Sequence, residues 1–294
     1  MTLKDALLLG RVSNLPTVWT NALTGLVLAG LADPVTDGRA FKPAFAILGM
    51  SLFYVGGMYL NDAFDVGFDA KNSPERPIPS GRVGRAAVFA AGFLLLACGL
   101  GATLLAAHSD PSASLVWPGL SGLTLIVAIV VYDWQHKSNP YAPLLMALCR
   151  ALVYVTAALC VTFPLAPDVL TAAGVVFAYL IGLTYTANQE HLGRVGALWP
   201  LLLLSVPVAF GVLNAQAGAA VPFLTAVLAA WIGFCVWLIV RGGANISKGV
   251  GNLIAGIALC DAVLLAAAGA GALSAMAVAC CALTFVLQHV VPGT

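Results

Sequence analysis

The sequence predicts an all-α polytopic membrane protein that forms a single domain over residues 1–294. The chain is 61% hydrophobic and 9% charged, with a mean hydropathy of +0.98, whereas a soluble domain has roughly 25% charged residues. Apolar segments of about 20 residues, the length that spans a bilayer, recur along the chain. Basic residues gather in alternate connections between these segments, which is typical of multi-pass membrane proteins.

Ten segments are long enough to cross a membrane, and nine spans is the alternative count. The last two segments are separated only by the uncharged stretch AGAGAL, so they form either a tight hairpin or one long broken helix. The expected limits are 13–32, 42–61, 85–107, 115–132, 142–163, 168–189, 196–214, 220–240, 250–269 and 272–291.

The distribution of basic residues predicts the orientation of the chain. If the N-terminus is inside, ten of the thirteen Lys and Arg residues fall in cytoplasmic connections; Arg39 and Lys42 fall outside and Arg150 lies within a span. This positive-inside pattern favours an integral protein of a bacterial inner (cell) membrane with a cytoplasmic N-terminus. The net charge of +1 gives no argument for nucleic acid as a partner. The seven cysteines lie in apolar segments without a CxxC pair, so we interpret them as small buried hydrophobes.

The stretch NDAFDVGFDAKNSPERPIPSG, from Asn61 to Gly81, concentrates charge at the end of the second span. On a continuous helix, Asp62, Asp65 and Asp69 at i, i+3 and i+7 share one face and repel each other. A cation among them would relieve this repulsion, and oxygen ligands suit Mg²⁺, with Mn²⁺ as the alternative. A solvated loop that obeys the positive-inside rule would explain the later arginines but explains the three aligned aspartates poorly.

Three short patches resemble the UbiA superfamily of membrane prenyltransferases. NDAFDVGFD, followed by Arg-Pro and Ser-Gly, resembles the first aspartate-rich motif, NDxxDxxxD, at the end of the family's second span. RVSN (Arg11–Asn14) resembles the RxxN element that opens the first span, and YDWQHK (Tyr132–Lys137) is similar to the Tyr-x4-Lys element after the fourth. The resemblance implies a UbiA-like bundle of nine to ten transmembrane helices with a cytoplasmic-side active-site mouth, in one prenyltransferase-like domain.

The resemblance also implies a reaction, namely Mg²⁺-dependent transfer of an isoprenyl group from a prenyl diphosphate to a small acceptor at the membrane. The expected partners are that diphosphate, an unidentified acceptor and membrane lipids. Metal-binding and catalytic roles fall to the three aspartates, with Asn61 as a further metal ligand. Diphosphate-binding roles fall to Asn14, Lys71, Arg76, Tyr132, Lys137 and Arg150.

The second aspartate-rich motif of the family is altered in this sequence. After the sixth span stands YTANQEHLGR (Tyr185–Arg194), where Thr186 and Glu190 occupy the positions of the usual DxxxD carboxylates. Asn188 and Glu190 could still bind one metal ion together with the first motif, or the stretch is only a polar helix end. This alteration, with YDWQHKSNP, LCRALVY and SKGVGNLIAGIALCDA, most resembles the divergent EboC-like branch of the superfamily.

Several roles and functions stay open at this stage. His136 is a candidate base for an acceptor hydroxyl, because its unperturbed pKa is about 6.5, although an interfacial histidine more often has no chemical role. Arg150 and Asp261 lie within spans, where ionisable groups are costly, so they form a structural pair or serve function. A UbiA-type terpene cyclase that acts on a prenyl diphosphate is the alternative function. A cation-coupled transporter is disfavoured because most spans lack polar residues near their centres.

Overall fold

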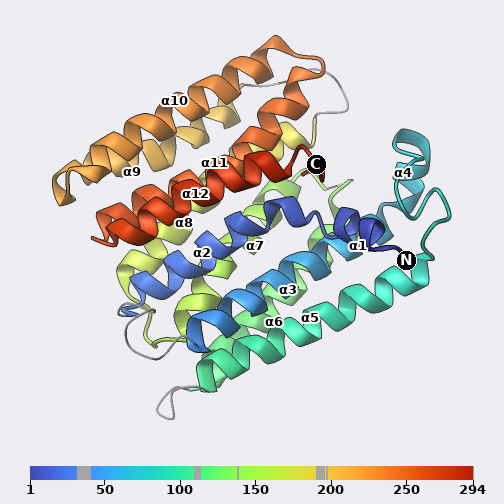
Figure 1. Cartoon of the computed structure of the whole chain (residues 1–294), viewed down its shortest axis with the longest axis horizontal. Helices are drawn as coiled ribbons and strands as arrows, with labels where there is room; N and C mark the ends of the chain where they lie inside the picture. Colours follow the sequence, from blue (N-terminus) through green and yellow to red (C-terminus); the bar gives the residue numbers. More distant parts are fainter. Residues whose placement is uncertain (32–40, 109–113, 138, 190–195, 197, 294) are drawn as a thin grey trace.

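The computed structural model describes residues 1–31, 41–108, 114–137, 139–189, 196 and 198–293, and this described part contains helices and no strands. Long helices run back and forth along one direction and form a bundle (Figure 1). The predicted all-α class is therefore confirmed. In chain order the elements are α1 (Leu3–Leu9), η1 (Val12–Asn14), α2 (Leu15–Leu28), α3 (Phe41–Phe64), α4 (Val66–Asn72), α5 (Arg85–His108), α6 (Val116–Gln135), α7 (Ala142–Leu159), α8 (Pro167–Ala187), η3 (Trp199–Ser205), α9 (Val206–Leu213), η4 (Ala215–Ala217), α10 (Ala220–Arg241), α11 (Asn245–Ala267) and α12 (Gly271–Leu287).

Seven helices in the described part of the chain are long and apolar enough to cross a membrane, namely α3, α5, α6, α7, α8, α10 and α11. The other expected spans are shorter or interrupted. Helix α2 has 14 residues because the turn η1 precedes it, and α12 has 17 residues. The expected span at 196–214 is divided into η3 and α9, with Pro207 in the first turn of α9, where its missing N–H group costs little.

Helices α11 and α12 form a tight hairpin, which settles the two interpretations of AGAGAL. The Ala270 N–H donates to Leu265 O at 2.9 Å, and the Gly269 N–H donates to Ala266 O at 3.0 Å. With Gly269 at a φ of +78°, this is a Schellman termination, in which glycine adopts the left-handed conformation at little cost. The chain therefore turns back on itself, as the ten-span count requires.

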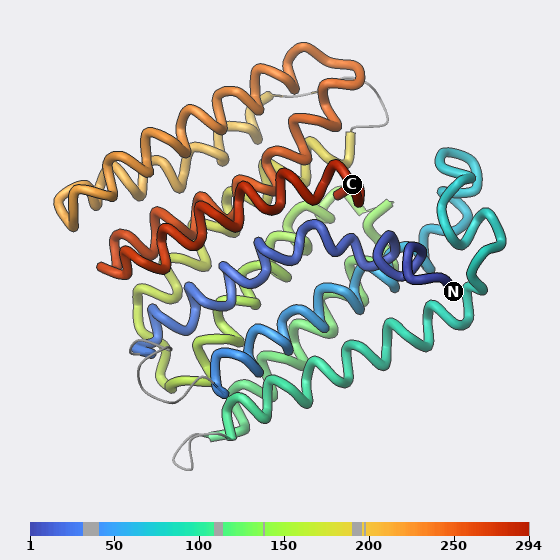
Figure 2. Tube along the Cα trace, viewed as in Figure 1, coloured from blue at the N-terminus to red at the C-terminus, as the bar shows by residue number. Residues whose placement is uncertain are grey.

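The two largest hydrophobic cores among the described residues are joined by α7. One core consists mainly of residues from α8, α10 and α11, and the other of residues from α2, α3, α5 and α6; α7 contributes to both. Helix α11 is the most buried of the seven helices that meet the spanning criteria. Both chain ends lie toward the end of the bundle that carries α4 (Figure 2), and we call this end the mouth.

Helices α2 and α7 cross so closely that their contact excludes any side chain at Gly25. A Cβ atom placed there would lie 2.5 Å from the backbone oxygen of Tyr154. Small residues at membrane helix crossings permit such close approach, and packing then takes the place of the hydrophobic effect. The crossing matters for the site because α2 and α7 both carry polar residues toward the interior.

We expect Gly25→Ala to destabilise the protein by about 1–3 kcal/mol, because the added methyl group meets backbone rather than a movable side chain. Gly101→Ala is the matched control, since a Cβ atom on Gly101 in α5 meets nothing within 4 Å. Thermal unfolding in detergent should show a lowered Tm for the first variant only. Equal Tm values for both variants would contradict the close crossing.

Candidate active site

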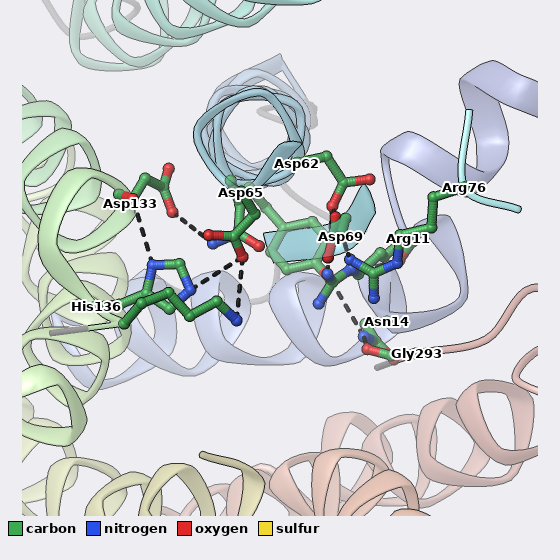
Figure 3. Close-up of polar contacts among 12 residues, drawn as sticks. Arg11, Asn14, Asp62, Asp65, Asp69, Arg76, Asp133, His136 and Gly293 are labelled. Carbon is green, nitrogen blue, oxygen red and sulfur yellow. Dashed lines mark hydrogen bonds and ion pairs between the residues drawn. The ribbon is translucent and has the colours of Figure 1, made fainter. Parts of the chain in front are cut away.

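The helix that carries the aspartates breaks at the mouth. Helix α3 ends at Phe64, Asp65 lies at the junction, and α4 begins at Val66. The single continuous face expected for the three carboxylates is therefore not formed. Asp62 and Asp69 share Arg76, whose Nη1 lies 3.6 Å from Asp62 Oδ1 and 3.0 Å from Asp69 Oδ2. Asp65 instead contacts the two residues that follow the end of α6 (Figure 3).

Basic side chains offset the repulsion among the carboxylates. Arg11 Nη2 lies 3.4 Å from Asp62 Oδ1. His136 Nε2 and Lys137 Nζ lie 3.1 Å and 3.2 Å from Asp65 Oδ2. Burial alone would raise the pKa of Asp65, but the hydrogen bonds and charges of His136 and Lys137 outweigh it, so the pKa lies below its ordinary value. Asp65 therefore remains a carboxylate that is able to bind a cation.

Arg11 holds an unusual backbone conformation to reach Asp62. It is the one non-glycine residue in the described chain with a positive φ, at +40°, a region that costs such residues about 1–3 kcal/mol. The Tyr54 hydroxyl donates to Arg11 O at 3.4 Å, and the Asn14 N–H donates to the same oxygen at 3.1 Å. This turn between α1 and α2 directs the guanidinium into the mouth.

Helix α6 supplies a further carboxylate at the same place. Asp133 is 3% exposed, and its Oδ1 accepts a hydrogen bond from Asn61 Nδ2 at 3.0 Å. Its other oxygen, Oδ2, is buried without a hydrogen-bond partner among the described residues. The His136 ring stacks on the Tyr132 ring, with 5.0 Å between the ring centroids, and His136 Nδ1 lies 3.3 Å from the backbone oxygen of Asp133. Figure 3 shows Asp133 and His136 on one side of Asp65 and the two arginines on the other.

A cavity of about 310 Å³ extends from this mouth into the bundle. Its polar end is lined by Asp65, Asp69, Arg76 and Lys137, and its interior by apolar and aromatic side chains, which include Met50, Phe53, Leu125, Ile129, Val153 and Ile257. Met50 precedes Asp62 by 12 residues on α3, or about 18 Å along a helix that rises 1.5 Å per residue. The cavity is therefore amphipathic along its length.

A buried polar network supports the wall of this cavity. Arg150 Nη1 donates to Asn21 Oδ1 at 2.8 Å, and Asn21 Nδ2 donates to Asp261 Oδ2 at 2.7 Å. Tyr154 donates to the other oxygen of Asp261. Arg150 and Asp261 are thus connected through the amide of Asn21. Arg150 also lines the cavity.

The C-terminal segment covers part of the mouth by binding Asn14. Gln288 Nε2 donates to Asn14 Oδ1 at 2.9 Å, while Asn14 Nδ2 donates to Gly293 O at 3.0 Å and to Tyr54 Oη at 3.2 Å. Both N–H groups of the Asn14 amide are therefore engaged within the protein. Gly293 itself lines the cavity.

Most of the described residues that were predicted for the site line this one cavity, but two of them do not. Asp62 is buried behind the arginines and is not among the lining residues, Lys71 is exposed on α4, and Glu190 lies outside the described residues. The predicted residues that line the cavity are Asn14, Asn61, Asp65, Asp69, Arg76, Tyr132, His136, Lys137, Arg150 and Asn188.

Sequence reasoning assigned no site role to Arg11 or Asp133. Arg11 opens the RVSN patch, and Asp133 follows Tyr132 within YDWQHK. Asp133 could have been suspected because it is a carboxylate at the end of an apolar span. Its contact with Asn61 is visible only in the folded structure.

The donor set at the mouth fits a hard divalent cation such as Mg²⁺. Within the described residues, no three His, Cys, Asp or Glu side chains form a ready metal cluster. Mg²⁺ does not need one, because it binds one or two carboxylates and completes its coordination with water and substrate phosphates. The unpartnered Asp133 Oδ2 and the neighbouring Asp65 are oxygen donors of this type.

A helical membrane bundle with such an amphipathic cavity is typical of membrane enzymes whose substrates have an anionic head and an apolar tail. Comparison with known proteins agrees with this class. The model of the UbiA prenyltransferase family matches residues 18–191, which is more than half of the chain. The protein therefore belongs to the UbiA prenyltransferase family, and it is a prenyltransferase.

Relatives agree with this membership, and solved structures share the fold. A digeranylgeranylglyceryl phosphate synthase of Methanoregula boonei is 27% identical over 263 residues, which cover 83% of this chain and 81% of the relative. The enzyme of the same name from Ignicoccus hospitalis is 40% identical, over 29% of this chain and 28% of its own. The apo structure of a UbiA homolog from Aeropyrum pernix K1 has a TM-score of 0.60 at 18% identity and covers 90% of this chain and 97% of its own. A structure described as digeranylgeranylglyceryl phosphate synthase in membranes has a TM-score of 0.59 at 18% identity, covering 92% and 98%.

The positions of the two predicted lysines lead to a test. Lys137 lines the cavity and contacts Asp65, whereas Lys71 is exposed away from it. We expect Lys137→Met to weaken binding of Mg²⁺ and inorganic diphosphate by at least about tenfold, the loss of one charge-assisted hydrogen bond. Lys71→Met should change the affinity little. Isothermal titration in detergent measures both, and an equal loss in the two variants would contradict the placement.

Proposed function

We propose that this protein transfers an isoprenyl group from a prenyl diphosphate to a small acceptor, with Mg²⁺ holding the diphosphate at the mouth. The amphipathic cavity is the observation that carries the proposal. Its charged end matches a diphosphate, and its apolar interior matches an isoprenyl chain. Exclusion of water by the apolar lining would also protect an allylic cation from hydrolysis.

The residues at the mouth divide into two roles. Asp65, Asp69 and Asn61 are the proposed cation ligands of the first motif, with Asn188 and Glu190 as ligands from the altered second motif. Arg76, Lys137, Tyr132 and Arg150 are the proposed diphosphate ligands. Bound Mg²⁺ would stabilise the negative charge that develops on the leaving diphosphate, and the cationic side chains add to this effect.

The reaction exchanges one C–O bond for another. The bond between the allylic carbon and the diphosphate breaks, and its electron pair stays on the diphosphate. An acceptor oxygen then donates a lone pair to that carbon, and its proton passes to an oxygen of the departing diphosphate. His136 is less suited to take this proton, because its two ring nitrogens already contact protein oxygens. Nε2 faces Asp65 Oδ2, and Nδ1 faces the backbone oxygen of Asp133.

The names of the relatives suggest the class of acceptor. Because the proteins from M. boonei and I. hospitalis are named digeranylgeranylglyceryl phosphate synthases, we propose a hydroxyl-bearing glyceryl phosphate that carries an isoprenoid chain. Asn14 is engaged by Gln288 and Gly293, so on this proposal it binds diphosphate only when the C-terminal segment moves.

Removal of the metal provides the main test. Activity with geranylgeranyl diphosphate and geranylgeranylglyceryl phosphate should disappear in excess chelator and return with added Mg²⁺. Asp65→Ala should lower kcat/KM by at least about 100-fold, comparable with the loss of a main electrostatic stabiliser. Product is measured by mass spectrometry of lipid extracts. Full activity in chelator would exclude the metal-dependent mechanism, and a hydrocarbon or terpene alcohol formed without acceptor would favour the cyclase.

We also propose that the mouth and the N-terminus face the cytoplasm, since the basic connections lie at that end. Ser80 and Ala217 are exposed, in the connection after α4 and between α9 and α10, and these connections lie at opposite ends of the bundle (Figure 1). In a cysteine-free background, an impermeant thiol reagent added to intact cells should label Ala217→Cys and not Ser80→Cys. The reverse labelling would invert the topology.

A further inference from the structure

Among the described residues, the end of α8 at the mouth has no carboxylate that could bind a cation. Thr186, at the first position of the altered motif, is fully buried, donates to Gly182 O at 3.0 Å and is not among the cavity-lining residues. Asn188 lines the cavity but carries no charge. Glu190 lies outside the described residues, so a second acidic ligand within the described part of the chain has to come from another element.

Asp133 on α6 has the properties that this role requires. It lines the cavity, is 3% exposed, and keeps Oδ2 without a hydrogen-bond partner in the described chain. Its single side-chain hydrogen bond comes from the neutral amide of Asn61, and in the same part of the chain no Lys, Arg or His forms an ion pair with it. A buried carboxylate without a compensating charge is strongly unfavourable, so this group either takes up a proton or has a cation beside it.

The neighbours of Asp133 are oxygen donors that suit the same ion. Because Asn61 donates its N–H group to Asp133, its carbonyl oxygen is left for another partner. Asp65 lies close by, since His136 contacts both Asp65 Oδ2 and the backbone oxygen of Asp133. These residues come from the end of α3, from the α3–α4 junction and from α6, and all three line the cavity. Figure 3 shows Asp133 beside Asp65.

We propose that Asp133 is a ligand of the divalent cation and adds a carboxylate to those of the two motifs; this assignment rests on the proposed metal-dependent function. Asp133 and Asp65 give two carboxylates, Asn61 gives a carbonyl oxygen, and the diphosphate and water complete the coordination. This composition is the usual one for Mg²⁺. It also agrees with the lack of a ready three-residue cluster among the described side chains.

Mn²⁺ binding to the full chain in detergent, in the presence of inorganic diphosphate, tests the assignment without catalysis. Free Mn²⁺ is followed by electron paramagnetic resonance for the wild type, for Asp133→Asn and for Asp168→Asn. Asp168→Asn is the matched control, because Asp168 is exposed in the first turn of α8, at the end of the bundle opposite the mouth (Figure 1). Asp133→Asn should weaken Mn²⁺ binding by at least about tenfold, because the loss of an outer-shell partner alone typically lowers metal affinity by that factor or more.

A second measurement separates a ligand from a structural residue. Without metal, Asp133→Asn should have a Tm equal to or above that of the wild type, because it removes an uncompensated charge. The rise in Tm that Mn²⁺ and diphosphate cause should be lost in this variant and retained in Asp168→Asn. If Asp133→Asn binds Mn²⁺ with wild-type affinity, the assignment of Asp133 is overturned, but the metal-dependent function is not. Absence of Mn²⁺ binding in the wild type would overturn the metal-dependent function and this assignment together.

Discussion

The pairing of acidic and basic side chains at the mouth is the interaction on which the rest of the site depends. Carboxylates near a bilayer repel each other and lose hydration, so they need nearby positive charge. Arg76 bridges Asp62 and Asp69, and His136 and Lys137 bind Asp65. These contacts connect the break after α3 with the end of α6, and they place cations where an anionic substrate would arrive. The same charges therefore stabilise the free protein and prepare the site.

A similar compensation operates deeper in the bundle. Arg150 on α7 and Asp261 on α11 would each be costly in an apolar interior, and Asn21 on α2 joins them through its amide. Three helices thus meet at one polar contact close to the tight crossing at Gly25. The consequence is a rigid wall beside the cavity, because each polar group restricts the position of the next.

The sequence predicted the helical class, the approximate spans and the location of the first motif, since these follow from apolar length and from charge at a span end. It could not predict the break at Asp65, because a periodicity argument assumes a straight helix. It also gave no site role to Asp133, whose contact with Asn61 joins positions 72 residues apart in the chain. Contacts of this kind depend on how helices pack, which local pattern does not encode. Glu190 lies outside the described residues, so its role stays a prediction.

The contact between Asn14 and the C-terminal segment has a consequence for biosynthesis. Asn14 stands at the start of the first span, whereas Gln288 and Gly293 follow the last helix. A membrane protein emerges from the ribosome from its N-terminus onward. During synthesis the mouth therefore stays incomplete until the hairpin of α11 and α12 has inserted, and a nascent chain that stops before α12 lacks two of the three partners of the Asn14 amide, Gln288 and Gly293. Completion of the site therefore follows the insertion of α12.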